Sequence, residues 1–185
     1  MFQALFIVLA YFWTGQYIVS AFTMILPLFV TDFVKIALST DRVTISKKPE
    51  TWQVGGMVGL SILIGILMLL ESLFLLFLFI HYTQVFTNPN QIQTFSFEVL
   101  FFFSIFSIFI LREKRYFWNS IPSPALLTAI SLDIALAVGF TTFGLPGLSQ
   151  FPFLQTLLVA SYTAMCSFSI NDYLKILYLT KKTHL

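Results

Sequence analysis

The chain has 185 residues, of which 58% are hydrophobic and only 10% are charged, and its formal net charge is +2. Its mean hydropathy is +0.89, and its charged fraction is far below the roughly 25% that is usual in soluble domains. A chain of this length has room for about six spanning helices of about 20 residues each, with short connections. We therefore expect an all-α integral membrane protein in which residues 1–185 form a single transmembrane helical domain, with no ATP-binding unit.

Six apolar runs follow one another along the chain, separated by polar stretches rich in turn-forming residues. We expect one helix in each run. The first is short, because a helix of 13 residues rises only about 20 Å against a hydrocarbon core of about 30 Å. It lacks the basic start and cleavage site of a signal peptide, so we expect it to be retained. The expected spans are 1–13, 17–38, 55–82, 95–111, 124–143 and 153–174.

Two of these runs carry additional signals. Small residues in the third run, among them Gly59 and Gly65, permit close contact with a neighbouring helix. Residues 171–178 are expected to continue the last run as an amphipathic helical end, with the final lysines near acidic lipid head groups.

Basic residues are confined to alternate loops, and this pattern predicts the orientation. Cytoplasmic loops of membrane proteins are enriched in Lys and Arg. The loops at 14–16, 83–94 and 144–152 contain neither, and Lys35 lies near the end of the second helix, where its stem can reach the interface. We therefore expect both termini on the cytoplasmic side. The basic residues behind this prediction are Arg42, Lys47, Lys48, Arg112, Lys114, Arg115, Lys175, Lys181 and Lys182.

Ionisable side chains inside the expected spans are candidate ion-path residues, because such a group in lipid must be paired, hydrated or protonated. In the second helix, Asp32 follows Thr31 and lies five residues after Pro27. Proline removes a backbone donor, and the carbonyl freed near Thr23 can help a carboxylate to hold a proton or a cation. Alternatively, Asp32 pairs with Lys35, which lies three residues further along the same face. The spacing does not decide between these interpretations.

Three further carboxylates lie in expected spans. Glu71 is near the middle of the third helix and Asp133 near the middle of the fifth, and no basic residue lies at mid-depth in any expected helix. Both are either protonated or hydrogen-bonded to polar neighbours, or they serve transport. Glu98 lies close to the outer boundary of the fourth helix, where we expect it to be hydrated.

Signatures of catalysis and metal binding are missing from the sequence. Cys166 is the single cysteine, and His81 and His184 have no second ligand at helical spacing, so we expect no metal site. The sequence contains no phosphate-cradling loop, no DKTG-type phosphorylation motif and no Ser/His/Asp order typical of a hydrolase. We therefore expect no cofactor, no nucleic-acid partner, and no enzymatic activity of this chain on its own.

Several short segments go beyond composition, most of them between residues 20 and 54. They are residues 20–22 (SAF), Asp32, 39–43 (STDRV), 46–52 (SKKPETW), 112–118 (REKRYFW) and 172–175 (DYLK). The first four resemble the sixth membrane helix and following loop of proton-pumping plasma-membrane P-type ATPases, and the last two resemble the loop after that family's eighth helix and the exit from its tenth. The chain thus resembles the second half of helix five through helix ten of such a pump, without the catalytic domains.

The resemblance implies that Asp32 falls on the helix-six carboxylate that helps to form the ion path of these pumps. Three positions depart from the family: Thr31 stands where the pumps carry Asn, Pro27 falls in the preceding turn, and Gln3 stands where plant and fungal pumps carry Arg. The candidate ion-path residues are Pro27, Thr31, Asp32, Glu71 and Asp133.

Three functions are compatible with these features. The first is a non-catalytic membrane subunit that packs in the lipid bilayer within a larger assembly, against another membrane protein chain or a second copy of itself. The second is the ion-path subunit of a split P-type proton or cation pump that uses Asp32. The third is an independent passive ion carrier or channel that uses Asp32, Glu71 and Asp133. In each case we expect a multi-pass protein of the plasma (cytoplasmic) membrane.

Overall fold

The structure is a computed structural model that describes residues 2–41, 54–83 and 89–183. These residues are largely helical and include no strand. A 3₁₀ turn, η2 (Phe117–Asn119), lies between two of the α-helices, and a π-helical segment, η3 (Cys166–Asn171), joins the last two. The α-helices are α1 (Phe2–Thr14), α2 (Ala21–Leu38), α3 (Val54–Tyr82), α4 (Pro89–Leu111), α5 (Pro124–Phe143), α6 (Phe153–Met165) and α7 (Asp172–Thr183).

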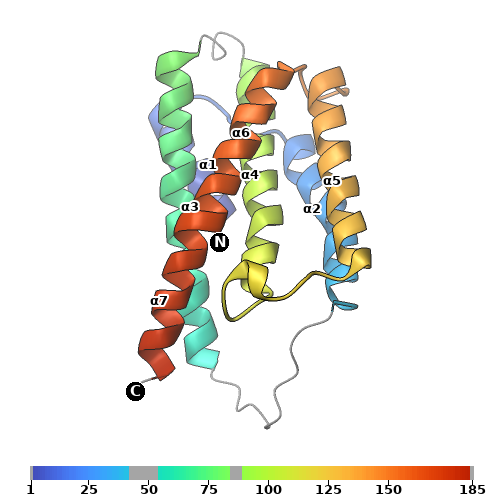
Figure 1. Cartoon of the computed structure of the whole chain (residues 1–185). Coiled ribbons are helices and arrows are strands. Elements are labelled where there is room, and N and C mark those ends of the chain that lie inside the picture. Colours follow the sequence, from blue (N-terminus) through green and yellow to red (C-terminus); the bar gives the residue numbers. More distant parts are fainter. Residues whose placement is uncertain (1, 42–53, 84–88, 184–185) are drawn as a thin grey trace.

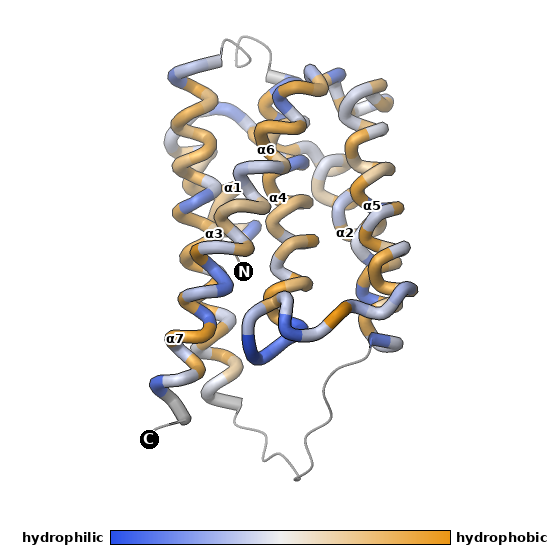
Figure 2. The backbone as a smooth tube through the Cα atoms, in the orientation of Figure 1, coloured by the Kyte–Doolittle hydropathy of each residue, from blue (hydrophilic) through white to orange (hydrophobic). Residues whose placement is uncertain are grey.

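The predicted fold class is confirmed. Five helical stretches are long and apolar enough to cross a membrane, and α1 is a shorter apolar helix. Figure 2 shows hydrophobic residues along the helices, while hydrophilic residues gather in the segment between α4 and α5. The chain is therefore an integral, multi-pass membrane protein, because a helix satisfies its own backbone hydrogen bonds in lipid.

The orientation of the termini stays a prediction. Several of the residues that carry it, Arg42, Lys47 and Lys48, lie outside the described residues, as does His184. Residues 42–43 and 46–52, which contribute to the family resemblance, also lie outside them.

Local sequence signals specify where two of the helices start. Ser20 caps α2: its Oγ accepts a hydrogen bond from the backbone N–H of Thr23 (3.2 Å), and Thr23 Oγ1 accepts one from the Ser20 N–H (2.7 Å). Ser123 caps α5, since its Oγ accepts from the Leu126 N–H (3.2 Å), and Pro124 takes the first helical position. These caps satisfy backbone donors that a helix otherwise leaves unpaired.

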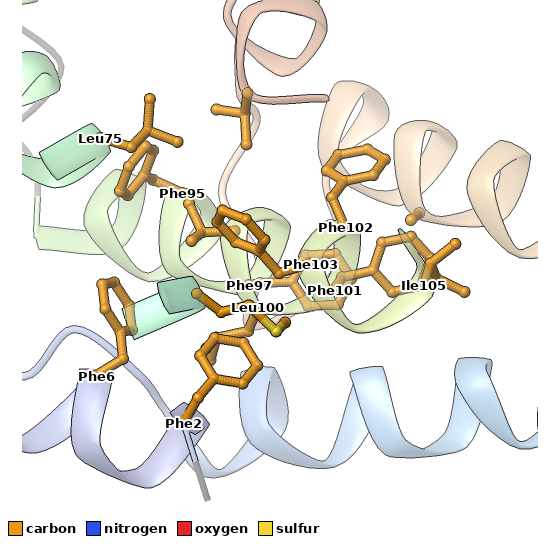
Figure 3. Packing of buried hydrophobic residues seen from close by; sticks show 14 of the residues in the cluster. Phe2, Phe6, Leu75, Phe95, Phe97, Leu100, Phe101, Phe102, Phe103 and Ile105 are labelled. Atoms are coloured by element: carbon orange, nitrogen blue, oxygen red, sulfur yellow. The ribbon is translucent and has the colours of Figure 1, made fainter. Parts of the chain in front are cut away.

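Helix α4 lies at the centre of the bundle (Figure 1). In its apolar stretch 72% of the residues are buried, against 28% to 39% in the other long helices. It begins at Pro89 rather than at residue 95, because the helix continues through polar turns beyond its apolar run. Its buried side chains pack against the surrounding helices, as Figure 3 shows, and include Phe95, Phe97, Phe101, Phe102, Phe103 and Ile105.

The short helix α1 packs on α3 and also contacts α4. The ring of Phe2 meets that of Phe103 edge to face, with ring centroids 6.3 Å apart. Gln3 Nε2 donates to Ser104 Oγ at 3.0 Å. Gln3 therefore makes this hydrogen bond inside the chain.

The last expected span is one continuous helical path through α6, η3 and α7, which crosses in front of the bundle in Figure 1. At the end of η3 the N–H of Asp172 donates to the Ser167 carbonyl, and this five-residue spacing defines a π-helical turn. The predicted continuation over residues 171–178 is helical, because α7 extends to Thr183.

Candidate functional site

The candidate residues of α2 lie on two different faces of that helix. Thr31 and Pro27 are buried, and the Thr31 hydroxyl donates to the Pro27 carbonyl at 2.7 Å. Asp32 points away from the bundle with 62% of its side chain exposed, and its Oδ1 lies 2.8 Å from Lys35 Nζ. The structure thus shows the local pairing of Asp32 with Lys35 and directs the carboxylate away from the interior. A role for Asp32 in an ion path stays a prediction.

Glu71 lies on the face of α3 that packs against η3, and only 9% of the residue is exposed. Asn171 Nδ2 donates to Glu71 Oε2 at 2.9 Å, across 100 residues of sequence. The Tyr162 hydroxyl donates to the backbone carbonyl of Glu71 at 3.2 Å. In the part of the chain that the structure describes, Glu71 Oε1 has no hydrogen-bond partner.

Asp133 is fully buried on α5, the helix that packs beside α2 in Figure 1. Neither of its carboxylate oxygens has a hydrogen-bond partner among the described residues. Since a bare carboxylate is strongly disfavoured in such a place, its charge must be removed by protonation or balanced by a bound group. It belongs to the buried stripe of α5, which consists of Leu126, Ile130, Asp133, Ala137 and Thr141.

The prediction that Glu98 is hydrated is wrong. Only 1% of the residue is exposed, and Thr156 Oγ1 of α6 donates to its Oε1 at 2.6 Å. The apolar run places Glu98 near a helix end, but α4 begins at Pro89 and Glu98 therefore lies deeper in the bundle. The polar residues before the run, such as Gln91, were the signal that could have corrected the helix start.

Lys175 is buried as well, although it is one of the basic residues that predict the cytoplasmic side. It is 1% exposed, and its Nζ lies 2.6 Å from the Asp172 carboxylate. The same ammonium donates to the carbonyls of Ile110 (2.8 Å), Glu113 (3.0 Å) and Arg115 (2.7 Å). Lys175 therefore joins α7 to the end of α4 and to the segment that follows it.

A second buried ion pair joins the ends of three helices. Arg112 Nη1 lies 2.7 Å from Asp41 Oδ2, and both side chains are almost fully buried. Arg112 also donates to the carbonyl and the hydroxyl of Ser120, and the N–H of Ser123 donates to Asp41 Oδ1 at 2.7 Å. The ends of α2 and α4 and the start of α5 are thereby fixed together. Sequence reasoning missed this pair because its members are 71 residues apart.

Glu113 lies beside these two pairs, outside the spanning helices. A hydrogen bond from Ser120 is the main cause that lowers the pKa of the Glu113 carboxyl, and the backbone N–H groups of Lys114 and Arg115 and the charge of Arg112 act in the same direction. Burial opposes the shift. The carboxylate is therefore held in its charged form in the folded chain.

The buried and exposed carboxylates of the spans do not converge on one centre. In residues 2–41, 54–83 and 89–183, no three His, Cys, Asp or Glu side chains are grouped as metal ligands would be. Asp32 pairs with Lys35 within α2, and Glu71 accepts a hydrogen bond from Asn171 of η3. Asp133 has no hydrogen-bond partner among the residues described. This arrangement does not favour an independent carrier that uses Asp32, Glu71 and Asp133 together.

Sequence comparisons place these features in a family context. No family model matches the chain. Three yeast proteins are similar to it over 114 residues, or 61% of its length: plasma membrane ATPase 1 of Saccharomyces cerevisiae (30% identical) and the plasma membrane ATPases of Kluyveromyces lactis (28%) and Zygosaccharomyces rouxii (29%). The matched region makes up only 12 to 13% of these relatives. The matches and the bundle of apolar helices together identify the chain as similar to the carboxy-terminal membrane domain of a P-type ATPase.

Proposed function

We propose that this chain is a non-catalytic membrane subunit that packs, through the outer face of α2, against a transmembrane helix of another chain. The assembly lies in the plasma membrane, as the names of the similar plasma membrane ATPases suggest. The matched region is a small fraction of those proteins, so their ATPase activity is not assigned to it.

One observation carries the proposal: the Asp32–Lys35 pair on the outside of the bundle. Its side chains are 62% and 52% exposed, within a helix that meets the length and composition of a membrane span. Asp32 lies about 9 Å from the end of α2 at a rise of about 1.5 Å per residue. Lys35 can reach the interface from the last turn, whereas the shorter carboxylate is better stabilised by a polar group of a partner.

The surface around the pair is otherwise apolar. Phe29 and Ile36, which lie one turn away on either side of Asp32, are 66% and 69% exposed. A partner helix that is apolar and presents one hydrogen-bonding or basic group at the depth of Asp32 fits this face.

Site-directed photo-crosslinking in native membranes tests the proposal. A photoreactive amino acid at Phe29 should join the chain to one discrete membrane protein. The matched control is Leu154 on α6, which is 68% exposed and lies on an outer face without charge. If Phe29 gives only lipid adducts, or the same products as Leu154, the proposed interface is wrong. A product of twice the mass of the chain identifies the partner as a second copy.

The outward position of Asp32 also keeps the split pump as a second candidate. An ion path through this carboxylate would run between two chains rather than through the bundle. In vesicles that contain the co-purified assembly, Asp32→Asn should abolish ATP-driven proton uptake, while Asp32→Glu should retain part of it. Uptake that is unchanged in Asp32→Asn excludes this candidate but leaves the structural role of the chain intact.

A further inference from the structure

Glu71 and Asn171 form an isolated polar contact between α3 and the π-helical segment η3. Both residues are at least nine-tenths buried, at 9% and 0% exposure. Asn171 Nδ2 donates to Glu71 Oε2 at 2.9 Å. Figure 1 shows the path of α6 and α7 crossing α3, and α3 packs against both η3 and α7.

The second half of this contact is unsatisfied. In the described part of the chain, neither Glu71 Oε1 nor Asn171 Oδ1 has a hydrogen-bond partner. Each unpartnered oxygen is bonded to the same carbon as one atom of the hydrogen bond that is formed. Both atoms are acceptors when Glu71 is ionised, and two buried acceptors without a donor are strongly disfavoured.

A single proton removes this conflict. A carboxylic acid and a primary amide are complementary: the acid O–H donates to the amide oxygen while the amide N–H donates to the acid carbonyl. A proton on Oε1 supplies the donor that Asn171 Oδ1 lacks, so that one hydrogen bond would satisfy both unpartnered atoms. The same proton also removes the buried negative charge.

We infer that Glu71 and Asn171 form a proton-binding site in which Glu71 is the neutral acid and its Oε1–H donates to Asn171 Oδ1. The proton is taken from bulk water, and on release the Oε1–H bond breaks and the proton returns to water. No other bond changes. The inference is independent of the proposed interface on the outer face of α2, since it concerns a buried contact between α3 and η3.

The surroundings of the pair supply no alternative positive charge. The titratable groups that interact with Glu71 are Tyr162 of α6 and Cys166 of η3, both neutral in their ordinary forms. Further along the helical path, Asp172 and Lys175 are paired with each other. Among the residues that the structure describes, no cationic side chain therefore interacts with Glu71 to hold it ionised.

The π-helical turn explains why Asn171 reaches α3. One extra residue in the turn shifts the helical faces, so that Ser167 and Asn171 are buried just before α7 resumes the α-helical register. Ser167 Oγ also has no hydrogen-bond partner within the described ranges. The turn thus holds two buried polar side chains, of which Asn171 contacts Glu71.

Infrared difference spectroscopy tests the inference on the full chain in lipid nanodiscs, together with any membrane protein that co-purifies. The spectrum of the wild type minus that of Glu71→Gln isolates the carboxyl group of residue 71. At neutral pH we expect the carbonyl stretch of a protonated acid, shifted in heavy water. In Asn171→Leu this stretch should move, because its hydrogen-bond partner is gone. Glu98→Gln, which removes a buried carboxyl held by Thr156, is the matched control and should leave the band unchanged.

Measuring the free energy of unfolding over a range of pH keeps the test decisive if Asn171→Leu does not fold. The Gln amide repeats the donor and acceptor pattern of the acid, so Glu71→Gln should fold as stably as the wild type. The wild type should lose stability as the pH rises. The folded chain holds a proton on Glu71 that the unfolded chain does not hold, so unfolding releases this proton and is favoured at higher pH. Glu71→Gln should lose the part of this dependence that Glu71 contributes, and Glu98→Gln should keep that part.

Three results would overturn the inference. The first is a wild-type spectrum with only carboxylate bands for Glu71 at neutral pH. The second is an acid band that does not move in Asn171→Leu. The third is a pH dependence of stability that is the same in the wild type and in Glu71→Gln.

Discussion

Two Lys–Asp pairs with the same spacing allow a matched test of burial in this bundle. Lys175 and Asp172 are each 1% exposed with N and O atoms 2.6 Å apart, whereas Lys35 and Asp32 are 52% and 62% exposed at 2.8 Å. Lys175→Met leaves a buried carboxylate without its cation and removes the donor to three carbonyls. Breaking a buried pair from one side lowers the free energy of unfolding by about 3–5 kcal/mol, whereas an exposed pair contributes about 1 kcal/mol or less.

Cys166 provides the assay. It is the single cysteine of the chain and is 3% exposed, so a thiol-reactive dye reports unfolding during a denaturant titration. Lys175→Met should shift the unfolding midpoint several times further than Lys35→Met. The double variant Lys175→Met/Asp172→Leu should recover part of the loss, because it also removes the unpaired charge. The reasoning is refuted if Lys175→Met is no less stable than Lys35→Met.

Three further predictions use the same dye assay. Thr156→Val removes the donor to the buried Glu98 carboxyl and should lower the free energy of unfolding by about 1–3 kcal/mol, while Thr156→Ser should stay close to the wild type. The lowered pKa of Glu113 contributes stability that is fully present above its ordinary value of 4.5 and is lost as the pH falls through the folded value, so the wild type should weaken below that pH and Glu113→Gln should weaken less. Gly59→Ala places a methyl group against the Tyr178 hydroxyl and should destabilise by about 1–3 kcal/mol, but not when Tyr178 is already Ala.

Each of these predictions has a clear contrary result. Equal stability of Thr156→Val and Thr156→Ser would show that the hydroxyl does not support the carboxyl group. An acid-side profile that is identical in the wild type and Glu113→Gln would remove the proposed contribution of that carboxylate. If Gly59→Ala destabilises the chain equally with and without the Tyr178 ring, the added methyl group does not clash with that ring.

Much of the architecture follows directly from the sequence. The apolar runs predicted the helices, the short first helix and the helical continuation over residues 171–178, and the structure contains them. The starts of α2 and α5 are specified by Ser20 and Ser123, whose side chains need only neighbours three residues away. The local spacing of Asp32 and Lys35 likewise contained the pairing that the structure shows, although it did not exclude the alternative.

The tertiary structure decided which polar groups are buried and what they meet. The contacts of Glu98 with Thr156, Glu71 with Asn171 and Lys175 with the Ile110 carbonyl join residues 58, 100 and 65 positions apart. The π-helical turn that orients Asn171 leaves no recognisable mark in the composition of the run. The physical reason is that lipid and protein interior are both apolar, so a spanning helix need not be amphipathic and its sequence does not reveal which face will meet another helix. Only packing sets the rotation of each helix, and that rotation turns the Asp32 carboxylate outward and the carboxyl groups of Glu71 and Asp133 inward.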